Sequence, residues 1–246
     1  MGQKATSTPG QALQELRSAL ASEPRLGGEF RADRLDLEPD GVLILEGEVD
    51  TVAQKKIALE IAAAFPAITG IVDRLRLRPA ERMGDAEIRA HLRRVFSMDP
   101  SLSGLDVNEF RGGSIKTIVK TPEPNGTLEY EVVDGIVTLN GALMDLAVKR
   151  YVGVLAWWVP GCRDVINGIA VASDDSDGPD RIADAVRLVL EKNPYLDAAQ
   201  VKVGVRNRIV RLTGLLPSQA QCEMAQNDAW CIFGVDQVIN EIKVGA

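Results

Sequence analysis

Hydrophobic and polar positions follow one another in the same order three times along the chain. Blocks of about forty residues that begin at Asp40, Asp134 and Asn207 align without a gap. Each block opens with alternating apolar residues, for example Val137 and Leu139 in the second, which predicts a strand. A helical pattern and a second apolar strand complete the block. A pattern that repeats at this scale predicts three copies of one small fold, not one large core.

An amphipathic segment stands before each block. Its apolar residues recur at helical spacing, and it ends at Pro24, Pro100 or Pro194, because proline disfavours helix in the residue before it. A strand then leads into the block through turn residues such as Asp40-Gly41, which predicts a hairpin. Each repeat is therefore predicted to be an α-β-β-α-β unit, an α+β sandwich in which two helices cover one face of a three-stranded sheet.

Individual residues align as closely as the pattern does. A glycine ends the middle strand of each repeat, and a residue that favours the helix N-cap follows shortly after it. These glycines are Gly47, Gly141 and Gly214. Near the end of the block Asn167 aligns with Asn240, whereas the first repeat has Asp73. The first repeat is thus the most diverged of the three at its end.

The repeats divide the chain into three predicted domains, 11–79, 82–173 and 178–246. Composition shifts at two segments between them, RPAERMGD at 78–85 and ASDDSDGPD at 172–180, and both predict linkers. A small domain buries only a modest share of its surface, so contacts between neighbouring repeats are expected to add stability.

The second repeat contains an insertion at about 103–126 that the other repeats lack. Alternation from Ser114 to Lys120 predicts an extra strand at the edge of the sheet, which could bind another chain by strand addition. The alternative is a hairpin that packs against the neighbouring repeat. Arg111, Lys116 and Lys120 make the insertion basic in an acidic protein, so they are candidate binding residues. Because the other repeats fold without this segment, its removal is expected to leave the fold of the second repeat intact.

The second helix of the second repeat carries the other candidates. Two adjacent tryptophans stand near its end, and the first of them lies at the edge of the apolar face. Three uses are open for them: a contact with a neighbouring repeat, a protein partner, or insertion at a membrane interface. Two basic residues are expected to make its outer side basic, as Lys55 and Lys56 do in the first repeat. The candidates on this helix are Trp157, Trp158, Lys149 and Arg150.

Charge and residue chemistry exclude several classes of function. The net charge of −7 is spread over all three repeats, so nucleic-acid binding through clustered basic residues is not expected. His91 is the one histidine, and no serine or cysteine stands in the sequence context of a histidine partner. An enzyme is therefore not expected, and neither is a metal or another cofactor.

No stretch of the chain is apolar and long enough for a signal peptide or a transmembrane helix. As written, the chain is expected to be cytoplasmic. If an export signal had been removed from it, a periplasmic location would be expected instead.

The end of each repeat carries a family resemblance. The third repeat ends in GVDQVINEIKV and the second in GCRDVINGIAV, while the first has AITGIVDRLRL and lacks both the glycine and the asparagine. Together with the hairpin and the helix between them, this pattern resembles the BON domain of bacterial osmotic-shock-induced and nodulation-associated envelope proteins. The resemblance covers nearly the whole chain. It implies a non-enzymatic binding domain, often in tandem, with a stress-response setting and attachment to phospholipid or envelope components, and it carries over no catalytic residues.

Two functions therefore stay open. The first is a binding or scaffold protein that attaches to a phospholipid surface, as the resemblance implies. The second is an adaptor for a protein partner, or for self-association, that binds no lipid.

Overall fold

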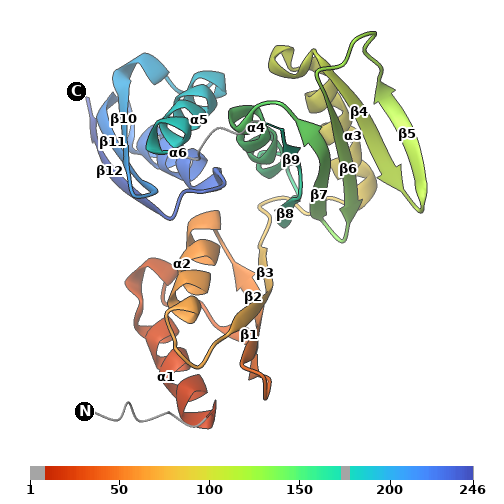
Figure 1. The fold of residues 1–246 in the computed structure, drawn as a ribbon. Coiled ribbons are helices and arrows are strands. Elements are labelled where there is room, and N and C mark those ends of the chain that lie inside the picture. The colour runs from red at the N-terminus through yellow and green to blue at the C-terminus, as the bar shows by residue number, and fades with distance from the viewer. Residues whose placement is uncertain (1–8, 173–177, 246) are drawn as a thin grey trace. The chain divides into compact units, whose positions relative to one another are not determined.

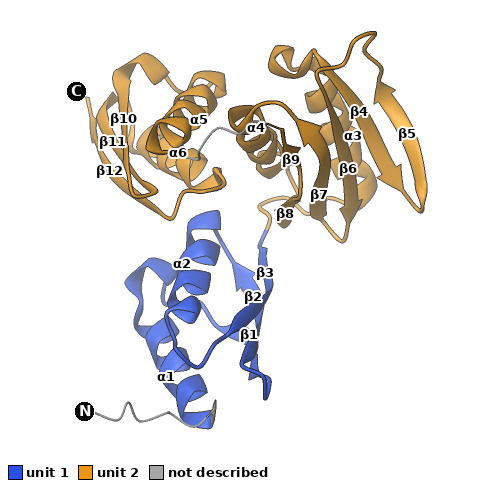
Figure 2. Ribbon diagram, viewed as in Figure 1, with its two compact units in different colours: residues 1–78 blue, residues 79–246 orange. Residues whose placement is uncertain are grey.

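The computed structural model describes residues 9–172 and 178–245. The chain forms two compact units, residues 1–78 and 79–246 (Figure 2). The first unit holds the first repeat, and the second unit holds the other two. The predicted linker at 172–180 falls mostly outside the described residues.

The first unit is a three-stranded sheet with both helices on one face (Figure 1). In chain order its elements are α1 (Pro9–Ser22), the short 3-10 helix η1 (Pro24–Leu26), β1 (Ala32–Leu37), β2 (Val42–Val49), α2 (Val52–Ala63) and β3 (Gly70–Leu77). The middle strand β2 is antiparallel to β1 and parallel to β3. Leu43 and Leu45 on β2 are fully buried, while their neighbours on the strand are partly exposed, as the alternating pattern predicts.

The second repeat contains the same unit in an enlarged form. Its elements are α3 (Asp85–Met98), η2 (Pro100–Leu102), β4 (Leu105–Arg111), β5 (Ser114–Val119), β6 (Gly126–Val133), β7 (Ile136–Leu143), α4 (Leu146–Trp157), β8 (Asp164–Asn167) and β9 (Ala170–Val171). The strand order is β5-β4-β6-β7-β8, and β9 also pairs with β7. The sheet is thus larger than the three strands predicted for this repeat, because the insertion supplies β4 and β5 and the last strand is split into β8 and β9.

The third repeat returns to the three-stranded form. Its elements are α5 (Pro179–Lys192), η3 (Ala198–Gln200), β10 (Val201–Arg206), β11 (Ile209–Leu216), α6 (Gln219–Cys231) and β12 (Gln237–Val244). Helix α4 of the second repeat packs against α5 and α6, and one continuous cluster of buried apolar residues runs through both repeats. The predicted α-β-β-α-β unit is confirmed in each repeat, and the second and third repeats share a core.

The aligned glycines are explained by the close approach of a neighbouring strand. Gly141 and Gly214 have φ angles of 115° and 145°, which residues with a side chain rarely adopt. A Cβ atom on Gly141 would lie 2.0 Å from the carbonyl oxygen of Thr127, and one on Gly214 would lie 1.9 Å from that of Gln200. Any side chain at these positions would push the hairpin strands apart.

The aligned asparagines tie the last strand to the second helix. The Asn167 side-chain amide donates to the carbonyl oxygen of Lys149 at 3.0 Å, and that of Asn240 donates to Cys222 at 2.8 Å. Each asparagine also accepts the backbone N–H of the residue two positions further along the chain. The repeated residue therefore satisfies backbone groups where strand and helix meet.

Candidate interaction surfaces

The hairpin β4–β5 extends the sheet of the second repeat. Strand β4 runs parallel to β6, β5 pairs antiparallel with β4, and β5 is the last strand of the sheet. The predicted extra strand at the sheet edge is confirmed. The outer edge of β5 pairs with no strand among the described residues, and Ser114 through Thr117 are exposed. This edge is open for pairing with another chain.

Strand β4 is part of the core rather than an addition to the surface. Val107 is fully buried and Leu105 is 5% exposed, both within the shared apolar cluster. Removing the insertion would expose the apolar surface that these two residues cover. The burial of Leu105 and Val107 therefore changes the expectation that the second repeat keeps its fold without the segment.

A buried carboxylate anchors β4 to the first helix of its repeat. Glu109 accepts hydrogen bonds from Arg93 at 2.6 Å and from the Tyr130 hydroxyl at 3.0 Å, and Arg89 lies 3.8 Å away. Burial raises the pKa of Glu109, but the bonds from Arg93 and Tyr130 outweigh it and leave the pKa below its ordinary value. Burial beside the same carboxylate raises the pKa of Tyr130. Glu109 therefore stays charged at neutral pH and fixes the strand.

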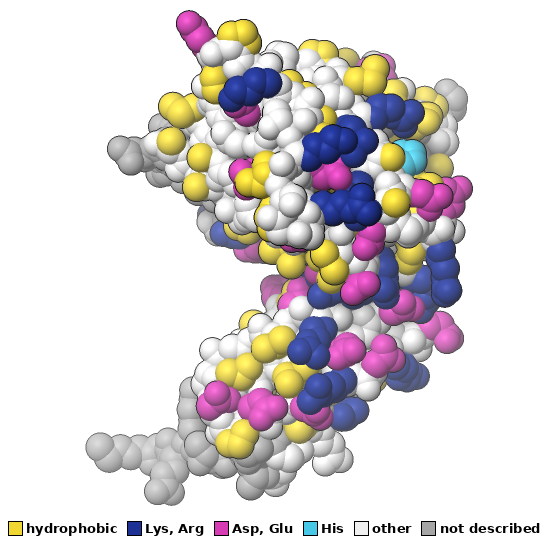
Figure 3. Space-filling model, turned by 90° about the vertical axis from the view of Figure 1, so that its right-hand side faces the viewer, with side chains coloured by type: hydrophobic (Ala, Val, Ile, Leu, Met, Phe, Trp, Pro, Cys, Tyr) yellow, Lys and Arg dark blue, Asp and Glu magenta, His cyan; other side chains and the backbone are white. Residues whose placement is uncertain are grey.

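Basic side chains gather around the hairpin. Figure 3 shows Lys and Arg side chains over the face on which β5 and α3 lie, with some acidic ones among them. Arg111 and Lys116 are exposed, and Arg94 on α3 is exposed as well. Lys120 forms an ion pair with Asp106, and the hydrogen bond from Lys120 lowers the pKa of that carboxyl. The three candidates in the insertion thus lie on or next to one hairpin. Lys120, directly after β5, also links the end of that strand to the start of β4 through Asp106.

The other basic candidates lie elsewhere. Arg150 is fully buried, and its Nε donates to the carbonyl oxygen of Phe233 in the third repeat at 2.8 Å. The Nζ of Lys149 lies 5.3 Å from the centre of the Phe233 ring, and burial lowers the pKa of Lys149. The prediction that Arg150 lies on an outer, solvated side of the helix is wrong, because α4 lies between its own sheet and the third repeat.

Trp158 also faces the third repeat. Its indole N–H donates to Asp228 on α6 at 2.8 Å, and the Asn193 side chain donates to the other oxygen of that carboxylate at 2.6 Å. Burial raises the pKa of Asp228, and the two hydrogen bonds offset only part of this effect. Trp157 is partly buried and packs against the shared core. Of the three uses open for the tryptophans, the structure shows for Trp158 a contact with the neighbouring repeat.

Lys55 on the second helix of the first repeat is buried and not solvated. Lys55 is 7% exposed, so the prediction that it lies on the outer side of α2 is wrong. Its Nζ lies 2.8 Å from Asp73 and donates to the carbonyl oxygen of Leu75 at 2.8 Å. Asp73 aligns with Asn167 and cannot donate as the amide does. The first repeat therefore joins last strand and second helix by an ion pair.

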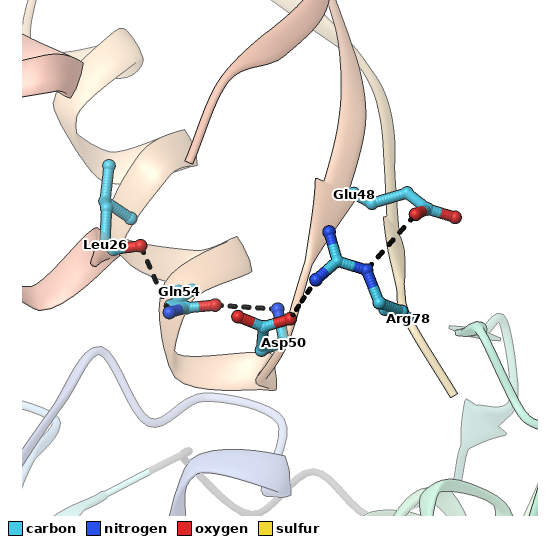
Figure 4. A network of polar contacts seen from close by, with 5 residues as sticks. All are labelled: Leu26, Glu48, Asp50, Gln54 and Arg78. Atoms are coloured by element: carbon cyan, nitrogen blue, oxygen red, sulfur yellow. Dashed lines mark hydrogen bonds and ion pairs between the residues drawn. The ribbon is translucent and has the colours of Figure 1, made fainter. Parts of the chain in front are cut away.

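A polar network fixes the start of α2 (Figure 4). Gln54 donates to the carbonyl oxygen of Leu26 at 3.1 Å and accepts the N–H of Asp50 at 2.7 Å. The Asp50 carboxylate accepts from Arg78, which also lies 3.4 Å from Glu48. Thr51 accepts the Gln54 backbone N–H, as its predicted N-cap role requires. These contacts connect the start of α2 to η1 and to the end of β3. They stabilise the first unit.

Sequence reasoning missed Glu109, Arg93 and Asp228. A carboxylate in a strand or a helix is normally solvated, so nothing in the sequence marks the two buried ones. A signal existed for Arg93, which stands seven residues before the proline that ends its helix, as Arg17 and Arg187 do in theirs.

Comparison with known proteins agrees with the repeat pattern. The family model of the BON domain matches residues 10–79, 116–173 and 179–246. The second match begins inside β5, so α3 and β4 lie outside it. A search of curated proteins gave no match.

Two solved structures of CdsD, a structural protein of the Type III secretion system of Chlamydia trachomatis, are similar to the chain at low identity. The C-terminal domain of CdsD is 15% identical, over 95% of this chain and 97% of that chain, with a TM-score of 0.25. The second structure is 16% identical, over 94% and 91%, again with a TM-score of 0.25. Similarity at this level carries no conclusion about arrangement or partners. Within residues 9–172 and 178–245, none of the helices is both long and apolar enough to cross a membrane.

Proposed function

The chain belongs to the BON domain family, and we propose that it is a non-catalytic scaffold that binds a protein partner through the hairpin β4–β5 of its second repeat. BON domains are binding modules, and the chain carries three of them. We propose domain limits of 11–79, 82–173 and 178–246, with the second and third domains acting as one body because they share a core.

The observation that carries this proposal is the open, basic edge of β5. An extended segment that pairs with such an edge gains backbone hydrogen bonds, while side chains select the partner. Lys116 in the middle of the strand opposes indiscriminate pairing, as charged residues on edge strands do. A partner with acidic residues beside the pairing segment would neutralise Lys116 and Arg111. The hairpin therefore favours an acidic protein partner.

The tryptophan helix has a supporting role in this proposal. Arg150 and Trp158 hold the second and third repeats together, and Trp157 packs beside them. Lys149 completes the contact through the Phe233 ring. These side chains keep the body that presents β5 rigid and are not proposed to touch the partner.

Site-specific photo-cross-linking tests the proposal. A photoreactive residue replaces Thr117 on β5 in the full chain, and adducts formed in a bacterial extract are identified by mass spectrometry. We expect one defined protein adduct that disappears with Lys116→Glu and persists with Lys202→Glu, an equal charge change at another exposed strand position. An adduct that both variants remove equally, or no adduct, would speak against a specific partner at this edge.

Phospholipid binding is the second candidate, and the basic side chains on the β5 and α3 face favour it (Figure 3). Co-sedimentation with vesicles of phosphatidylcholine alone, or mixed with phosphatidylglycerol, separates the two functions at low and physiological salt. Binding to the anionic vesicles that survives physiological salt and is lost in Lys116→Glu would replace the protein-partner proposal. If the chain instead binds a protein partner, we expect it to stay in the supernatant at physiological salt.

A further inference from the structure

An arginine on the first helix bonds a strand on the same side of the sheet in all three repeats. Arg17, Arg93 and Arg187 occupy the same position relative to the proline that ends each helix. In the first repeat Arg17 donates to the carbonyl oxygen of Leu35 on β1 at 3.3 Å, and in the third Arg187 donates to β10 in the same way. In the second repeat the arginine instead binds Glu109 of the inserted strand. The arginine thus bonds the edge strand where that strand is uncovered and bonds the added strand where one is present.

The strands β1 and β6 are equivalent, but only β6 is covered. The backbone N–H of Glu38 donates to the carbonyl oxygen of Val42 across the first hairpin. In an antiparallel pair, every second residue along β1 therefore directs its backbone hydrogen-bonding groups toward β2. Leu35 and Leu37 therefore direct their backbone groups away from β2, toward the free edge. In the second repeat the matching edge of β6 is paired in parallel with β4. The first repeat therefore has a free edge at the position where the second repeat carries an additional strand.

A groove lies beside this free edge, between α1 and β1. Its volume is about 250 Å³, and its lining includes Arg17, Leu20, Phe30, Arg31 and Leu35. Leu20 and Phe96 both stand four residues before the proline that ends their helix, and Leu35 and Tyr130 pair with the aligned residues Leu45 and Leu139. The rings of Phe96 and Tyr130 lie 5.5 Å apart in the second repeat.

In the second repeat the counterpart of this groove is filled by β4. Val107 is fully buried in the same cluster as Phe96 and Tyr130, and Glu109 reaches Arg93. The second repeat therefore shows which side chains the empty groove of the first repeat is shaped to receive.

We propose that the β1 edge and its groove bind an extended segment of a partner protein that runs parallel to β1. The segment carries an apolar residue followed two positions later by a carboxylate. The apolar side chain takes the place of Val107, and the carboxylate takes the place of Glu109. Arg17 then leaves the Leu35 carbonyl for the carboxylate, because a charge-assisted hydrogen bond is stronger than one to a neutral oxygen. This site is separate from the β5 edge and does not depend on the function proposed for it.

The chain supplies its own probe for this site. A fluorescently labelled peptide with the sequence of residues 104–112, GLDVNEFRG, contains the strand that fills the second repeat. Fluorescence anisotropy with the full chain measures its binding, and hydrogen exchange locates it. We expect saturable binding with protection of β1, and a loss of roughly tenfold in affinity in Arg17→Gln or Arg17→Glu. A peptide with lysine in place of its glutamate should bind Arg17→Glu better than it binds the wild type.

Controls separate this site from others. Arg34→Glu makes an equal charge change on β1, where Arg34 pairs with Asp36 and not with α1, and it should bind the peptide as the wild type does. Lys116→Glu should also leave binding unchanged, so failure of the β5 proposal would not be confused with failure here. Absence of binding at millimolar peptide, an equal loss in Arg34→Glu, or protection at β6 instead of β1 would each overturn the proposal. Unfolding curves of the Arg17 variants check that the first unit remains folded.

Discussion

The strands β1 and β6 hold the same place in their repeats, yet β1 is an uncovered edge strand and β6 lies inside a larger sheet. At β1 the guanidinium of Arg17 bonds a strand carbonyl beside a groove. At β6 an inserted strand fills that place with Val107 and Glu109. The difference teaches that the same α-β-β-α-β unit can carry its first strand either covered or free. Where the edge is covered the addition supplies core, and where it is free the same geometry remains available to a partner.

The second helices show a parallel difference. Lys55 on α2 is bound within its own repeat by Asp73, whereas Arg150 on α4 reaches into the third repeat. The Lys55 ammonium is thus bound within one repeat, whereas the Arg150 guanidinium bonds a neighbouring repeat.

The largest expected effect tests whether β4 is core. Val107→Asp places a carboxylate among buried apolar side chains, which should lower the free energy of unfolding of the second unit by about 4 kcal/mol or more. Hydrogen exchange of the full chain measures protection in both units of one molecule. Protection should fall across the second unit and stay unchanged in residues 9–78.

Asn108→Asp is the matched control for this change. Residue 108 is the next on the strand and is partly exposed, so it should cost less than about 1 kcal/mol. If Val107→Asp lowers the free energy of unfolding as little as Asn108→Asp does, β4 is not part of the core.

A smaller effect tests the ion pair of the first repeat. Lys55→Met removes the ion pair with Asp73 and one hydrogen bond to the Leu75 carbonyl, and it should destabilise the first unit by about 2 kcal/mol. Adding Asp73→Asn supplies the amide that Asn167 uses in the second repeat, and urea unfolding should recover about half of the loss. Lys56→Met, one residue along the helix, is the control and should have little effect. If the double variant recovers no stability, the Lys55–Asp73 ion pair and the Asn167–Lys149 hydrogen bond are not equivalent connections between strand and helix.

The smallest effect is a pH dependence of the contact between the second and third repeats. Burial raises the folded-state pKa of Asp228 above its unfolded value, so the folded state holds the proton more tightly. This contribution to stability is fully present below the unfolded pKa of about 4 and is lost as pH rises through the folded pKa. Asp228→Asn removes the titration.

Urea unfolding at a series of pH values measures this effect. The wild type should gain stability relative to Asp228→Asn as pH falls through that window. Asp184→Asn changes an exposed carboxylate on α5 and is the matched control. A wild-type advantage that grows with rising pH would contradict the raised pKa.

Much of the fold could be read from the sequence because it depends on neighbours along the chain. Alternation, turn residues and N-caps predicted the strands and helices of each repeat, and the alternation from Ser114 predicted the edge strand β5. Gly141 and Gly214 aligned because the hairpin strands lie too close for a side chain. Three of the candidate residues, Arg111, Lys116 and Lys120, lie on or directly after the hairpin β4–β5, which contains the predicted extra strand.

The sequence by itself determined the repeated unit, its number of copies and the basic insertion. Only the tertiary structure decided which faces were buried. Helical periodicity identifies a polar face but cannot tell whether water or another repeat covers it, so Arg150 was placed outside. Glu109 is buried and charged because Arg93 and Tyr130 approach it from α3 and β6. The exposure of a side chain depends on contacts between residues far apart in the chain, and local pattern carries no record of those contacts.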